Sequence, residues 1–108
     1  MASLKPHELE ALRKLKEALA RDFRLVELRL FGSKARGDSR LESDIDVLIV
    51  LKDVDREVRK RVSVLCCDLS IDHHVVITPI LYSLAEFNSG RTRVTPFYRN
   101  VAREGVPV

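Results

Sequence analysis

The chain of 108 residues contains no long hydrophobic run and only two cysteines. The first absence argues against a membrane-spanning protein, and the second argues against a disulfide-stabilised or zinc-binding one. No apolar run approaches the ~20 residues that a membrane-spanning helix needs. Cys66 and Cys67 are adjacent, a spacing that rarely forms a disulfide, and no Cys-x-x-Cys pair is present for zinc or redox chemistry. Charged residues such as Lys5 and Glu8 interrupt the first ten positions, which therefore do not resemble a signal peptide. We expect a cytoplasmic protein.

The composition indicates one globular domain over residues 1–108, with 45% hydrophobic and 32% charged residues and no internal repeat. Nineteen basic and sixteen acidic residues give a net charge of +3, which suits nucleotide or RNA partners only mildly. The three basic residues at 59–61 are more typical of a solvated surface than of an RNA-binding patch. On a helix, Cys66 and Cys67 are most simply small core residues.

Hydrophobic spacing predicts alternating helices and strands. Leucines at three- and four-residue intervals predict a helix over 6–21, and residues 24–31 alternate as a strand does. Residues 47–51 are continuously apolar, as in a central strand covered on both faces. We expect a helix over 55–70 capped by Asp55, a strand over 72–80, a short turn capped by Ser83, and a last helix over 95–104 ending at Gly105.

The connection lengths predict the topology. The link between residues 31 and 44 is too short for an ordinary parallel crossover, so the first two strands should pair antiparallel. The helix over 55–70 allows a right-handed parallel crossover to the third strand. The predicted fold is α/β (α+β), a small mixed sheet with an antiparallel first pair and flanking helices.

Residues 30–50, LFGSKARGDSRLESDIDVLIV, carry the chemistry. Gly32 permits close approach of the backbone to a ligand, and Ser33 follows at the start of a short helix, where free N–H groups favour phosphate. Asp44 and Asp46 are two residues apart, so on a strand both leave the same face. Paired carboxylates repel each other unless a cation lies between them, and oxygen ligands suit Mg²⁺. A phosphate cradle beside a metal site is what phosphoryl or nucleotidyl transfer needs.

This segment resembles a known signature. Gly32-Ser33 with residues 35–37 (ARG), followed by residues 43–46 (SDID), is similar to the motif of the DNA polymerase beta superfamily of nucleotidyltransferases. Within that superfamily the chain most resembles the minimal nucleotidyltransferase domains of prokaryotes. The resemblance implies the nucleotidyltransferase fold and transfer of a nucleoside monophosphate, AMP from ATP, to an acceptor, for which a protein partner is one candidate. No G-x-x-x-x-G-K-[ST] motif supports a Walker-type alternative.

The resemblance also assigns roles to residues. Gly32 and Ser33 would hold the triphosphate of ATP or another nucleoside triphosphate. Arg36 would either reach the triphosphate or brace a nearby aspartate. Asp44 and Asp46 would be catalytic and would hold Mg²⁺, with two ions expected.

Members of the superfamily often place a third carboxylate on the third strand. Asp72 is the candidate for this catalytic and metal-binding position, and an ordinary residue at the strand edge is the alternative. His74, two residues on, shares its face on a strand and is a second candidate.

Two functions stay open. One is the Mg²⁺-dependent transferase, and the other is an antitoxin-like binding module with weak or no catalysis. Domains of this type are commonly paired with a helical HEPN-type protein, a ribonuclease that the small domain neutralises. The sequence leaves a homo-oligomer open as well.

Overall fold

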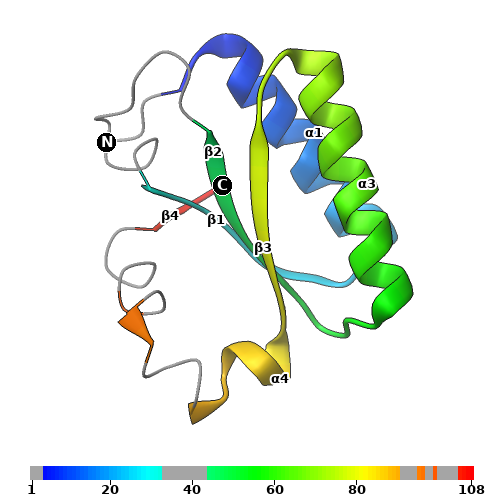
Figure 1. The fold of residues 1–108 in the computed structure, drawn as a ribbon, viewed down its shortest axis with the longest axis vertical. Helices are drawn as coiled ribbons and strands as arrows, with labels where there is room; N and C mark the ends of the chain where they lie inside the picture. The colour runs from blue at the N-terminus through cyan, green and yellow to red at the C-terminus, as the bar shows by residue number, and fades with distance from the viewer. Residues whose placement is uncertain (1–3, 33–43, 91–94, 97–98, 100–104) are drawn as a thin grey trace.

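The computed structural model describes residues 4–32, 44–90, 95–96, 99 and 105–108. These residues form a four-stranded sheet with the order β3-β2-β1-β4 and helices packed against it (Figure 1). Along the chain the elements are α1 (Pro6–Asp22), β1 (Leu25–Phe31), β2 (Ile45–Leu51), α3 (Arg56–His73), β3 (Ile77–Ser83), α4 (Leu84–Phe87) and β4 (Val106–Pro107).

The strand pairing confirms the predicted topology. β1 and β2 are antiparallel, with Phe31 aligned with Asp46, and β2 and β3 are parallel, with Asp46 aligned with Thr78. α3 makes the crossover between the parallel strands. β4 pairs antiparallel with the outer edge of β1 and was not predicted, because two residues, one of them Pro107, carry no periodic signal.

β2 is buried on both of its faces, as its sequence predicts. Alternate residues from Ile45 to Leu51 lie in the main core with the inner sides of α1 and α3. Leu48 and Val50 point to the opposite face, where side chains from the ends of β1 and β3 and from α4 pack against them: Phe31, Tyr82, Leu84 and Phe87. Among the described residues, one face of the sheet is therefore covered by the long helices α1 and α3, and the other is covered by the short helix α4; we call the latter the open face.

The predicted caps are confirmed. Asp55 accepts a hydrogen bond from the backbone N–H of Val58 at 2.8 Å, which begins α3. Ser83 accepts one from Glu86 N–H at 3.1 Å, and the Glu86 carboxylate accepts one from Ser83 N–H at the same distance, which fixes α4. A reciprocal pair of this kind satisfies backbone donors that a helix start leaves free.

The predicted strand over 72–80 begins too early. α3 continues to His73 and ends at His74, whose left-handed backbone (φ 54°) caps the helix. Ser70 then joins the two elements, since its hydroxyl donates to Cys66 O and accepts from Ile77 N–H. The helix lacks the glycine that usually marks such an end, so the sequence offered no stop signal before β3.

Two further expectations have different outcomes. Cys66 is buried as predicted, but Cys67 is exposed, because neighbouring residues on a helix point about 100° apart and only one of them faces the core. The predicted helix over 95–104 lies for the most part outside the described residues. Within the described part of the chain, none of the helices has the length and apolar character needed to cross a membrane.

Candidate nucleotide and metal site

Asp44 and Asp46 lie on the open face of the sheet. β2 begins between them, and Asp46 shares its face with Leu48 and Val50, which point away from α1 and α3. Asp44 is two residues earlier and therefore has the same orientation. Asp44 is exposed and Asp46 is half-buried, so both carboxylates remain accessible to a ligand.

Gly32 lies directly against one of these carboxylates. β1 ends at Phe31, which is aligned with Asp46, and the next residue, Gly32, has a left-handed φ of 72°. A Cβ at Gly32 would be 2.5 Å from Asp46 Oδ2, closer than real contacts allow. Only glycine fits here without displacing the carboxylate, and the start of the predicted phosphate cradle and the carboxylate pair therefore meet.

Thr78 is the site residue that sequence reasoning missed. It is the second residue of β3 and is aligned with Asp46 across the parallel pair. Its hydroxyl donates to Asp44 Oδ2 at 3.4 Å, a long hydrogen bond. The apolar run already begins at Val75, two residues before β3, so the run by itself does not set the register of Thr78.

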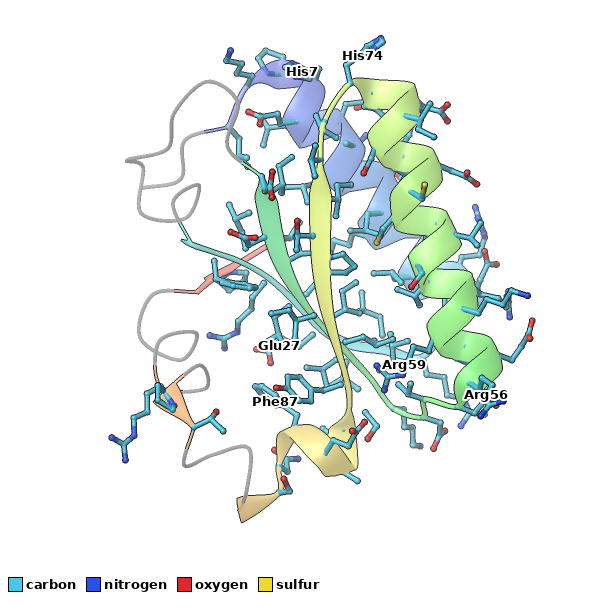
Figure 2. The ribbon with its side chains drawn as sticks, in the orientation of Figure 1. His7, Glu27, Arg56, Arg59, His74 and Phe87 are labelled. Carbon is cyan, nitrogen blue, oxygen red and sulfur yellow. The ribbon has the colours of Figure 1, made fainter. Side chains whose placement is uncertain are left out.

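The structure does not bring Asp72 to this pair. Asp72 is exposed in the last turn of α3, and α3 packs its inner side on the sheet face opposite to Asp44 and Asp46. His74 ends the same helix and points away from the strands (Figure 2). The residue of β3 that lies level with Asp46 is Thr78, which carries a hydroxyl and no carboxylate.

Ser33 and Arg36 lie outside the described residues, so their predicted roles stay predictions. Among the described residues no group of three or more His, Cys, Asp or Glu side chains surrounds a metal position. Two carboxylates with a neighbouring hydroxyl nonetheless form an oxygen-only donor set, and Mg²⁺ is commonly held by one or two carboxylates together with substrate phosphates. The donor set therefore fits that ion.

A model of the nucleotidyltransferase domain family matches residues 12–95 of the chain. This span is more than half of the 108 residues and contains every predicted site residue. The chain belongs to the nucleotidyltransferase family. The expected fold and the expected enzyme class, a transferase, are thereby confirmed.

Individual relatives agree with the family. A Methanocaldococcus jannaschii protein, "Putative protein adenylyltransferase MJ0604", is 41% identical over 101 residues, which are 92% of this nucleotidyltransferase and 95% of the relative. A solved structure described as a "putative minimal nucleotidyltransferase" has a TM-score of 0.62 and 26% identity, with 93% and 95% of the two chains covered. A "toxin-antitoxin with AMP-PNP" shares the fold, with a TM-score of 0.61, 23% identity and coverage of 91% and 69%.

Proposed function

We propose that this nucleotidyltransferase transfers AMP from ATP to a hydroxyl group of a protein acceptor, with Mg²⁺ held by Asp44 and Asp46. The observation that carries the proposal is the carboxylate pair on the open sheet face, with Gly32 packed against Asp46. The name of the relative that is 41% identical, a protein adenylyltransferase, supports a protein acceptor. The neighbour crystallised with AMP-PNP, an analogue of ATP, supports the nucleotide.

The described residues have separate tasks in this reaction. Asp44 and Asp46 would hold the metal, and Gly32 leaves space for the carboxylate and for close approach of a phosphate to the backbone. Thr78 orients Asp44 through its hydroxyl. Bound Mg²⁺ would supply neutralisation of the charge on the reacting phosphate and on the leaving pyrophosphate. The acceptor oxygen forms its bond to the α-phosphorus as the bond to pyrophosphate breaks; the electron pair of that bond leaves with pyrophosphate, and the hydroxyl proton passes to water.

The test compares Asp44→Asn with Asp72→Asn. Each variant removes one exposed carboxylate, but only Asp44 lies on the site face. Protein labelling with α-³²P-ATP and Mg²⁺ should fall by about 10²–10³-fold in Asp44→Asn, because metal ligation supplies several kcal/mol of charge stabilisation. Asp72→Asn should label at the wild-type rate. Equal loss in both variants, or in neither, would contradict the assigned site.

A second readout separates binding from turnover. Mg²⁺ with AMP-PNP should raise the Tm of the wild-type protein and of Asp72→Asn, because a ligand that binds only the folded state stabilises it. Asp44→Asn should show a smaller shift in Tm. The same shift with and without Mg²⁺ would count against a metal-bridged nucleotide.

The second candidate function is an antitoxin-like binding module for a HEPN-type ribonuclease. It is favoured by the absence of a third carboxylate beside Asp44 and Asp46 among the described residues, and by the fold neighbour described as a toxin–antitoxin. Co-expression with such a ribonuclease distinguishes the two functions. Neutralisation that survives in Asp44→Asn indicates binding alone, and neutralisation lost in that variant indicates that AMP transfer to the partner is the active step.

A further inference from the structure

The outer side of α3 carries apolar side chains that the transfer reaction does not use. Val64 is 51% exposed and Ile71 is 69% exposed, and the thiol-bearing Cys67 is exposed between them. Positions 64, 67 and 71 follow the spacing that places residues on one side of a helix. Figure 1 shows α3 at the side of the molecule, with α1 and the sheet on its inner side. We call Val64, Cys67 and Ile71 the α3 stripe.

A hollow of about 330 Å³ adjoins the stripe. Its apolar lining comes from Phe23, Val64 and Leu65, and charged residues that include Lys60 and Asp68 complete it. The Arg61 guanidinium lies over the Phe23 ring, 4.7 Å from its centroid, and so holds one wall in place. This hollow has room for a branched aliphatic side chain such as that of isoleucine.

Charge is divided along α3. The first half exposes four basic residues and one acidic residue, Glu57, whereas the charged residues exposed in the second half are both acidic: Arg56, Arg59, Lys60 and Arg61 with Glu57, then Asp68 and Asp72. Asp72 lies in the last turn, where the helix dipole disfavours a negative charge. Among the described residues, neither Lys60 nor Asp68 nor Asp72 has an ion-pair partner. A helix that packs on α3 in the opposite direction, with the same charges, would supply those partners.

We propose that the α3 stripe docks on the α3 stripe of a second copy of this chain, with the two helices antiparallel. A two-fold axis makes the two surfaces identical, so each must complement itself. With the axis between Val64 and Cys67, Lys60 lies about 8 Å from the centre along the helix, at the level of Ile71 in the other copy. Lys60 then meets Asp68 and Asp72 of that copy within one turn, and Ile71 faces the hollow beside Val64.

The expected dimer is weak and leaves the transfer site open. α3 has 18 residues and is therefore about 27 Å long, which limits the buried area to the low end of specific interfaces. Interfaces at that end are typical of weak, transient association, so the concentration series below is set in the micromolar range. Asp44 and Asp46 lie on the sheet face opposite to α3, so both copies keep an accessible site.

Charge reversal tests the pairing between copies. Sedimentation velocity over a micromolar concentration series should show dimerisation of the wild-type protein, weakened at least about tenfold by Lys60→Glu and likewise by Asp68→Lys. The combined variant Lys60→Glu/Asp68→Lys should recover the dimer, because each reversed charge again meets its opposite. Lys14→Glu on the exposed side of α1 is the matched control and should dimerise normally.

The results that overturn the proposal are specific. If the wild-type chain stays monomeric throughout the series, self-docking is refuted, and the α3 stripe would then be a docking surface for a different protein. If Lys60→Glu dimerises as the wild-type protein does, the interface between the copies does not include Lys60 and lies elsewhere. A combined variant that fails to recover refutes the antiparallel arrangement of the two helices.

Cys67 provides an independent readout. Mild oxidation should join two copies through Cys67, which lies next to the proposed axis, and the product should persist in Cys66→Ala and disappear in Cys67→Ser. Cys66 is buried, and its burial raises the pKa of the thiol to about 11, so it stays protonated and unreactive near neutral pH. A sedimenting dimer without the Cys67 cross-link would place the interface away from the stripe.

Discussion

Replacing Gly32 by alanine would place a methyl group in the space of the Asp46 carboxylate. The added Cβ would lie 2.5 Å from Asp46 Oδ2 and 3.4 Å from Asp46 Cγ. The oxygen belongs to a side chain that can rotate away, so most of the stability loss comes from the left-handed backbone, where φ is 72°. That conformation costs an alanine roughly 1 kcal/mol, which lowers Tm by about 4–8 °C in a domain near this size.

The loss of activity should exceed what the lost stability explains. An Asp46 carboxylate turned out of place by about 1 Å costs on the order of 10²-fold in rate. The assay is labelling from α-³²P-ATP at 25 °C, with Tm measured on the same preparations to show that the variant is folded. The matched control is Gly90→Ala, because among the described residues, its chain neighbours apart, no heavy atom lies within 4 Å of a Cβ at Gly90. That control should label at the wild-type rate.

One outcome would refute the reasoning about Gly32. If Gly32→Ala loses stability as expected but labels within about threefold of wild type, the position of the Asp46 carboxylate does not depend on the close approach. The contact would then be a packing detail, and the phosphate cradle would have to be sought in the residues after Gly32.

Three further predictions address the site and the fold. Thr78→Val should reduce labelling by about 2–10-fold with little change in Tm, since it removes one hydrogen bond to Asp44, and Thr78→Ser should retain the wild-type rate. Removal of divalent metal with EDTA should abolish labelling, and excess Mg²⁺ should restore it fully. Asp55→Ala should lower the free energy of unfolding by about 1 kcal/mol through loss of the α3 cap, measured by urea denaturation, while labelling at 25 °C stays unchanged.

The sequence predicted the parts of the fold that depend on chain length and periodicity. A short link after Phe31 requires an antiparallel return, and a helix of sufficient length after β2 permits a parallel neighbour. The antiparallel return places Gly32 beside Asp44 and Asp46, and the structure shows Gly32 in close approach to Asp46. The two capping predictions, Asp55 and Ser83, succeeded because a cap is a local interaction.

The errors arose where a local pattern does not fix the answer. α3 ends at His74 through a left-handed histidine rather than a glycine, so its last turn was assigned to the next strand. A shift of a few residues in the start of β3 replaces Asp72 by Thr78 at the level of Asp46, because parallel register decides which residue lies there. The exposure of Cys67 likewise depends on which side of α3 packs on the sheet.

The alternation of side chains along β2 separates the transfer site from the α3 stripe in space. Ile45 and Val47 point to α1 and α3, whereas Asp46, between them, points to the open face. A nucleotide on the open face and a second copy on α3 therefore use opposite sides of one sheet.

It follows that variants on the two sides should act independently, since charges exposed to solvent and separated by more than a Debye length of about 8 Å are largely screened. Lys60→Glu should remove the dimer without slowing AMP transfer, and Asp44→Asn should stop transfer without weakening the dimer. Loss of both properties in either variant would mean that the acceptor hydroxyl lies on the second copy.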